Sequence, residues 1–188
     1  MSMLRNQPVI SDMSHAAKHV EWCINKAQKE IEECKRLGKR SKHRGLLKSR
    51  PNLDEAKKHL AKAEHNLIGI TRFKEVGFSD WSMSAGFYCI YHCFLAIAAK
   101  FGYESGNQTC TISLMRFLKE NNEIQLDERF IELLEYEEME DVRADSVIDL
   151  REDYTYGVQI SVKDEAKINE LKKVCKELID ITKQIIYE

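Results

Sequence analysis

Proline and glycine are scarce in this sequence, which limits the number of tight turns that the chain can make. Of 188 residues, two are proline (Pro8 and Pro51) and eight are glycine. A fold built from many short strands needs frequent turn residues, so this composition argues against an all-β protein. Lysine, glutamate, alanine, leucine and isoleucine are frequent instead. The composition therefore predicts an all-α fold of long helices in one compact domain.

Long uninterrupted apolar runs are also missing. The longest apolar stretch, residues 87–101, is interrupted by His92 and Lys100 and is shorter than the roughly 18 to 20 residues that a membrane-spanning helix needs. We therefore expect no transmembrane helix and no membrane partner. The N-terminal residues show neither a basic stretch followed by an apolar run nor a small-residue cleavage site, which predicts a cytoplasmic protein.

The six cysteines form no dense framework, so we expect them to be reduced and mostly buried. Cys89, His92 and Cys93 lie within one helical turn, but zinc usually takes a second ligand pair, and none is present. Asp145, Asp149 and Asp153 recur every four residues; the arginines interleaved with them favour a solvated face over a Mg²⁺ site. No metal and no cofactor are predicted.

Charge is segregated along the chain. Residues 35–50 contain eight lysines and arginines and no acid, whereas residues 127–153 contain twelve acids and three arginines. Lys39, Arg40, Lys42 and Arg44 are candidate phosphate contacts, because uncompensated cations bind nucleic acid through counterion release. No aromatic residue is interleaved to stack bases, so sequence-specific reading is not predicted. A soluble connector, or a segment that docks on the acidic surface of a second copy, are the alternatives.

Apolar residues spaced three and four apart predict helices over about 14–36, from Asn52 to about 70, over 79–101, 109–120 and 127–139, and from Ser161 to the C-terminus. Asn52 with Glu55, and Ser161 with Asp164, have the spacing of helix caps. The 79–101 helix is apolar on nearly every side and is expected to be central. We predict an N-terminal helical extension over 1–37, a basic linker over 38–52 and a helical domain over 53–188.

Two motifs stand out in the second half of the chain. The first is F-Y-x-x-Y-H-x₃-A-x₅-G, filled by Phe87, Tyr88, Tyr91, His92, Ala96 and Gly102, and the second is R-E-D-Y at Arg151–Tyr154. With these motifs the chain resembles the HEPN superfamily over about residues 53–187. The resemblance implies an up-and-down helical bundle, here with an extra N-terminal helix, and frequent homodimers. It also implies roles in RNA-targeting toxin–antitoxin or defence systems, often beside a nucleotidyltransferase partner.

Catalytic members of this superfamily cut RNA with an arginine and a histidine that follows after four to six residues. The imidazole can move a proton while the guanidinium stabilises charge on phosphorus. After Arg151 the permitted positions hold Tyr156, Gly157 and Val158, so the histidine is absent. The remaining match, Arg36 with His43, lies in the basic linker, where we expect no rigid element to position it.

The sequence thus predicts a non-catalytic or degenerate HEPN protein, a homodimer that binds nucleotide, RNA or a nucleotidyltransferase. Arg151 is the expected phosphate-facing group, with Asp153 and Tyr154 orienting it. One alternative is an RNA endonuclease that uses Arg151 with Tyr154 or Tyr156, and another is a structural dimerisation module.

Among the motif residues Phe87, Tyr88, Tyr91 and His92, which we assign to the core or an interface, His92 could line a polar niche. It is more typical of a core histidine bonded to a hydroxyl or carbonyl.

Overall fold

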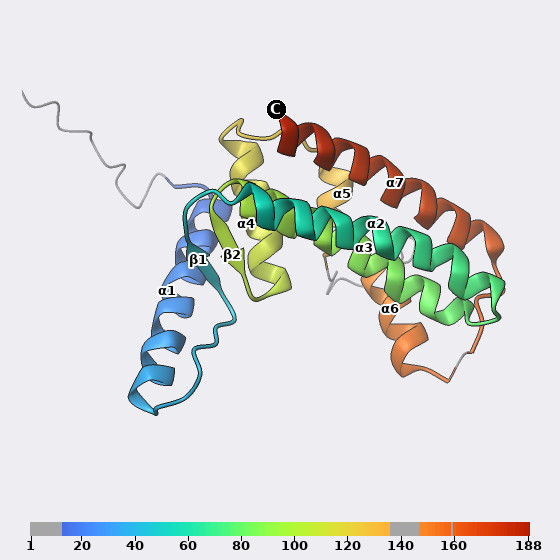
Figure 1. Cartoon of the computed structure of the whole chain (residues 1–188), viewed down its shortest axis with the longest axis horizontal. Coiled ribbons are helices and arrows are strands. Elements are labelled where there is room, and N and C mark those ends of the chain that lie inside the picture. Colours follow the sequence, from blue (N-terminus) through green and yellow to red (C-terminus); the bar gives the residue numbers. More distant parts are fainter. Residues whose placement is uncertain (1–12, 136–146, 159) are drawn as a thin grey trace, which may run out of the picture.

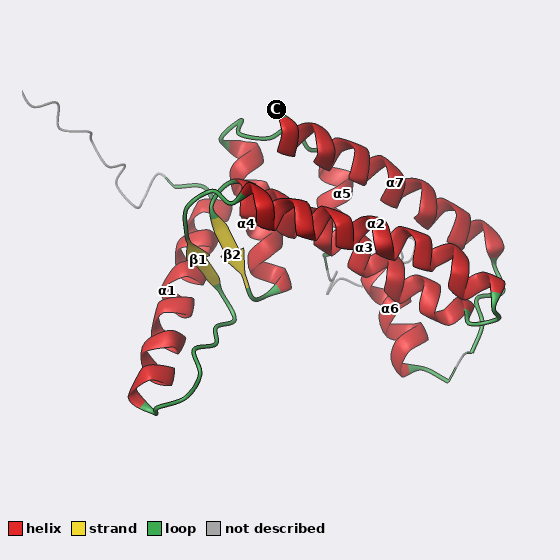
Figure 2. Cartoon of the chain, viewed as in Figure 1, coloured by secondary structure: helices red, strands yellow, loops and turns green. Residues whose placement is uncertain are grey.

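The described part of the chain is helical apart from one small two-stranded sheet (Figure 2). The computed structural model describes residues 13–135, 147–158 and 160–188. The elements in chain order are α1 (His15–Arg36), β1 (Leu46–Lys48), α2 (Leu53–Glu75), α3 (Ser79–Lys100), β2 (Tyr103–Ser105), α4 (Gln108–Glu120), α5 (Glu128–Glu132), α6 (Val147–Tyr156) and α7 (Glu165–Tyr187). The predicted all-α class is confirmed.

Helix α3 is the centre of the bundle. Helices α2 and α7 run alongside it, and α6 packs on it from another side, as Figure 1 shows. By length and composition α3 could cross a membrane, but 83% of its most apolar window is buried inside the protein. Its large buried side chains, Phe94, Ile90 and Ile97 among them, belong to the main hydrophobic core. It is therefore the core helix that the sequence predicted.

Side-chain caps explain where several helices begin. The Asn52 carboxamide oxygen accepts the Glu55 N–H at 3.0 Å at the start of α2, as predicted. Helix α7 begins later than the sequence suggested, because Asp164 caps it by accepting the Ala166 N–H. The prediction of Ser161 as its cap was wrong, since the next residue, Val162, donates its N–H to Ser79 at the start of α3.

The helix predicted over 127–139 is much shorter in the structure. Helix α5 ends at Glu132, and Leu134 closes a turn on the carbonyl of Ile131. Both Phe130 and Ile131 are buried, as their apolar spacing indicated. The end of the predicted helix, from residue 136, lies outside the described residues.

The basic linker contains a strand that the sequence did not predict. Strand β1 pairs antiparallel with β2, with Leu46 opposite Ser105 and Lys48 opposite Tyr103. Leu46 is fully buried, and Gly45 lies so close to α1 that a Cβ there would collide with the carbonyl oxygen of Cys23. A strand of three residues is too short to show alternating hydrophobicity, which is why the pattern missed it.

Two of the six cysteines are not reduced in the structure. Cys23 on α1 and Cys110 on α4 form a disulfide with their Cα atoms 5.9 Å apart, which contradicts the prediction for this pair. They are 87 positions apart in sequence, and the packing of α1 against α4 brings them together. Cys34, Cys89, Cys93 and Cys175 are free, and the last three are buried as predicted.

Candidate functional site

Arg151 on α6 is held against α3 by an aromatic ring. Its guanidinium carbon lies 4.5 Å from the centre of the Phe87 ring, a cation–π contact. The side chain is 19% exposed, and its Nε is buried without a hydrogen-bond partner among the described residues. Its acidic neighbour is Glu152, with Nη2 and Oε1 3.3 Å apart. The positively charged guanidinium of Arg151 thus packs on the Phe87 ring, and its N–H groups are not all hydrogen-bonded to described residues.

The other two residues of the R-E-D-Y element have different surroundings. Tyr154 is half-buried and packs against the hydrophobic core. Asp153 is exposed, and its backbone carbonyl accepts the Gly157 N–H. Within the described part, the contacts of Arg151 are with Phe87 and Glu152, so the structure brings neither Asp153 nor Tyr154 to the guanidinium.

The positions where a catalytic histidine would stand are exposed to solvent. Tyr156 ends α6, and Gly157 and Val158 follow it, all on the surface. In the described residues around Arg151, the groups that contact the guanidinium carry no imidazole. Among the described residues, Arg151 is therefore not in contact with a proton-transfer partner of the usual kind.

Arg36 and His43, the remaining match to the ribonuclease spacing, have separate acidic neighbours. Arg36 binds Glu33 one turn back on α1, while His43 Nε2 lies 3.4 Å from Glu104 on β2. His43 is held more firmly than expected, since its Nδ1 also accepts the Gly45 N–H. The two side chains point to different acids and share no site.

The candidate phosphate contacts Lys39, Arg40, Lys42 and Arg44 lie beyond the C-terminal end of α1, at the opposite end of the molecule from α6 (Figure 1). All four are exposed. Their side chains form no ion pair with the acids of the described ranges, 13–135, 147–158 and 160–188. The structure does not bring them together with Arg151 in one chain.

The aromatic residues of the first motif form a connected group on α3. Phe87 meets Tyr88 edge-on at 5.1 Å and stacks with Tyr91 at 6.1 Å between ring centres. Phe87 is buried and Tyr91 is half-buried, and burial raises the pKa of the Tyr91 hydroxyl. Tyr88 is exposed. Phe87 of this group therefore packs against the Arg151 guanidinium, and Tyr88 is exposed to solvent.

His92 pairs with a second histidine instead of a hydroxyl or carbonyl. Its Nδ1 lies 3.0 Å from Nδ1 of His59 on α2, and the two rings stack. Burial lowers the pKa of His92 to about 4, with the charges of His59 and Lys62 acting in the same direction. Burial also lowers the pKa of His59, which Glu55 one turn away partly opposes. One neutral ring donates to the other.

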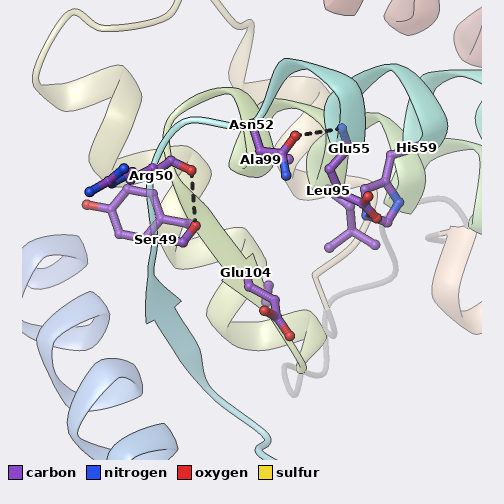
Figure 3. Close-up of a pocket in the computed structure, with 10 residues that line it drawn as sticks. Ser49, Arg50, Asn52, Glu55, His59, Leu95, Ala99 and Glu104 are labelled. Carbon is purple, nitrogen blue, oxygen red and sulfur yellow. Dashed lines mark hydrogen bonds and ion pairs between the residues drawn. The ribbon is translucent and has the colours of Figure 1, made fainter.

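His59 also lines an open cleft of about 710 Å³ at the start of α2, between α3 and β2. Figure 3 shows Glu55 and His59 on one wall, Glu104 on another and Arg50 at one end. The cleft mixes two carboxylates with one guanidinium and one imidazole. The sequence analysis missed it, although the spacing of Glu55 and His59 already placed both on one helix face.

The side chains weighed as metal ligands do not converge. Cys89 interacts with Cys93 and Cys175 in the core, and its hydrogen bond with the Cys175 thiol, together with burial, raises its pKa, whereas His92 turns to His59. No cluster of three or more His, Cys, Asp or Glu side chains suited to a metal occurs among the residues that the structure describes. Asp145 and the side chain of Asp149 lie outside them.

A model of the HEPN domain matches residues 56–186 of the chain, which is well over half of its length. The chain belongs to the HEPN family. Among curated proteins, none matches it. The HEPN match covers the helices α2 to α7, so both the Arg151 centre and the His59–His92 pair lie inside the family domain, while α1 and the basic residues of 39–44 lie outside it.

Proposed function

We propose that this HEPN protein binds RNA or nucleotide phosphate through Arg151 without cutting RNA. The observation that carries the proposal is the state of Arg151 itself. Its guanidinium packs on Phe87, and its 19% exposed side chain has Glu152 as its acidic neighbour among the described residues. A guanidinium of this kind is suited to a phosphate, which accepts two parallel hydrogen bonds from it.

The surroundings of Arg151 do not favour RNA cleavage. The three positions that could hold a catalytic histidine carry tyrosine, glycine and valine, and all are exposed. A phenol hydroxyl is a much weaker general base than an imidazole, so Tyr154 or Tyr156 would replace the missing histidine poorly. Binding without turnover is the function that remains.

The proposal extends to a homodimer, in which two Arg151 centres would be available to one RNA chain, and to a nucleotidyltransferase partner in a toxin–antitoxin or defence setting. Family membership supports both. A small nucleotidyltransferase gene adjacent to the gene of this protein would support the second, and co-purification of the two products would test it directly.

The central test compares Arg151→Ala with Arg129→Ala. Arg129 is a matched control, because its guanidinium also lies over a ring, 4.6 Å from that of Phe130, but it pairs with Glu177. Labelled single-stranded RNA is titrated at low salt and followed by fluorescence anisotropy. Loss of one charge-assisted phosphate contact, about 1.5 to 3 kcal/mol, should weaken binding by Arg151→Ala roughly tenfold or more, and Arg129→Ala should bind like the wild type.

The same samples are run on a denaturing gel after prolonged incubation. Intact RNA agrees with the proposal, whereas cleavage that disappears in Arg151→Ala would show that the protein is a nuclease. Equal affinities of the wild type and Arg151→Ala for RNA and for mononucleotides would remove Arg151 from the binding site.

A further inference from the structure

Helix α1 presents a second surface, outside the HEPN match, that combines aromatic rings with lysines. Residues spaced three and four apart on one side of α1 form what we call the α1 face; they are His15, Lys18, His19, Trp22, Lys26 and Lys29. The buried residues Ala16, Val20, Cys23 and Ala27 occupy a different side of the helix. The α1 face therefore lies beside the packing interface, and most of its residues are exposed, while His19 and Lys26 are half-buried.

The rings of the α1 face form a row. The ring centres of His15 and His19 are 6.3 Å apart, and those of His19 and Trp22 are 5.4 Å apart. The Lys26 ammonium lies 5.1 Å from the centre of the Trp22 ring. Trp22 is 54% exposed, so its ring is accessible to a ligand.

A hydrogen bond to α4 fixes this row in place. His19 Nδ1 lies 2.6 Å from the Ser113 hydroxyl, and that hydroxyl donates to the Thr109 carbonyl. His19 must therefore be the donor to Ser113, which orients its ring beside Trp22. A surface that is already ordered loses less conformational entropy when a ligand binds.

The basic segment 39–44 follows α1 in the chain. It turns back along α1, where the Arg44 N–H donates to Glu30, one turn beyond Lys26, and the Cys34 thiol contacts the Lys42 carbonyl. Residues 15–44 contain nine lysines and arginines against four glutamates, whereas the whole chain has a net charge of −2. Positive charge is thus concentrated in α1 and the segment that follows it, and Lys26 brings one of these charges to the Trp22 ring.

We propose that the α1 face and segment 39–44 bind single-stranded RNA, with an unpaired base stacked on Trp22 and phosphates on the surrounding lysines and arginines. Bases of any identity can stack on an aromatic ring, and cations can follow the backbone, so the chemistry suits single strands without sequence preference. A paired base cannot leave its stack to reach Trp22, which disfavours duplex RNA. This inference rests on the proposed function in taking RNA as the ligand.

The fluorescence of Trp22 can report on binding, and Trp81 can serve as the control. Its two tryptophans, Trp22 and Trp81, are almost equally exposed, at 54% and 51%. In the full-length Trp81→Phe protein only Trp22 emits, and an oligouridylate of about twelve nucleotides, within the site sizes of such surfaces, should quench this emission saturably and less strongly as salt is raised.

Anisotropy titrations with the labelled oligonucleotide then compare Trp22→Ala with Trp81→Ala. Loss of one stacked base should weaken binding about tenfold or more in Trp22→Ala, and Trp81→Ala should match the wild type. Circular dichroism checks that both variants are folded, which the exposure of both side chains makes the expected result.

Three results would overturn the inference: RNA binding that leaves Trp22 emission unchanged, equal affinities of the two alanine variants, or duplex RNA bound as tightly as the single strand. Arg151→Ala separates it from the proposed function. If Trp22→Ala binds weakly and Arg151→Ala normally, the α1 face stands and the Arg151 site fails. The reverse result removes the α1 face and leaves the Arg151 site in place.

Discussion

The imidazoles of His59 and His92 form a hydrogen bond in which a single proton lies between their two Nδ1 atoms. Their Nδ1 atoms are 3.0 Å apart, a distance at which one ring donates and the other accepts. Two protonated rings would place two positive charges at this contact, beside Lys62. The pair is therefore stable only while at least one ring is neutral.

This arrangement predicts that the protein loses stability in mild acid. The pKa of His92 is about 4 in the folded chain against an ordinary value of 6.5. Between these values the unfolded chain binds more protons, so the free energy of unfolding falls as pH drops from 6.5 towards 4. The full shift corresponds to about 3 kcal/mol, and partial exposure of the ring reduces this to roughly 1 to 2 kcal/mol.

Urea unfolding at about pH 7 and about pH 5 measures the effect. His92→Gln keeps a polar side chain beside His59 but cannot take up the proton, so it should lose less stability between the two pH values than the wild type does. His65→Gln is the control, because His65 is an exposed histidine on the same helix as His59. An unchanged pH dependence in His92→Gln would contradict the prediction.

At the scale of the elements, glycines decide how closely the helices approach. Gly86 on α3 faces α7, and a Cβ at this position would lie 2.6 Å from Cγ of Leu171. Leu171 is itself buried and cannot move aside without disturbing the core. Gly69 on α2 has more room, since the nearest atoms to a Cβ there are 3.6 Å away.

Alanine at these two positions should therefore have opposite effects. Gly86→Ala should destabilise the protein by about 1 to 3 kcal/mol through overpacking. Gly69→Ala should stabilise it by up to about 1 kcal/mol, because alanine has the higher helix propensity and meets no obstacle. Thermal and urea unfolding measure both changes. Equal stabilities would mean that α3 and α7 are not in the close contact described.

Helix α1 is attached by a narrow interface. Four small or medium-sized residues of α1 are buried, Ala16, Val20, Cys23 and Ala27, and such a stripe contributes little hydrophobic free energy. The Cys23–Cys110 disulfide and the His19–Ser113 hydrogen bond join the same two helices, α1 and α4. Together these contacts explain how a helix with few buried residues stays attached to the rest of the protein.

In the whole molecule, the two candidate RNA contacts lie at opposite ends of the fold. Arg151 lies on α6 and segment 39–44 beyond the end of α1 (Figure 1). One short RNA is not expected to reach both within a single protomer. A homodimer would multiply the available contacts and raise the apparent affinity for longer RNA without any new contact.

The proposed homodimer can be tested at Tyr88. This side chain is 45% exposed beside Phe87 on α3, and a large aromatic residue at such a site is typical of an interface. Tyr88→Arg should convert a dimer into a monomer, because it would bury two like charges at a symmetric contact. Light scattering after size exclusion gives the mass. Ile68→Arg on α2, 61% exposed, is the control and should stay dimeric.

Local signals in the sequence predicted the long helices well. The spacing of apolar residues and the cap at Asn52 were sufficient for α2, and the apolar character of 79–101 was sufficient for α3. Both signals act within one or two turns of chain. The start of α7 was misplaced at Ser161 because a contact with Ser79, far away in sequence, draws that segment to α3 instead.

The candidate site was predicted only in part. The sequence pointed to Arg151 through its motif, and to His92, but not to the partners that define their chemistry. Phe87 under Arg151 and His59 beside His92 come from other helices. The aromatic row on α1 was missed because Trp22 lies outside the basic run, and only the structure shows that segment 39–44 turns back along the same helix.

Four properties follow from the amino-acid sequence alone: the all-α class, the central position of α3, the HEPN resemblance that the family match confirms and the lack of a histidine after Arg151. These properties depend on which residues are present and on spacings of a few positions. The Arg151–Phe87 contact, the paired histidines, the Cys23–Cys110 disulfide and the β1–β2 pairing became visible in the folded chain. Each of these joins residues that are tens of positions apart, and helix packing, not local spacing, brings such residues together.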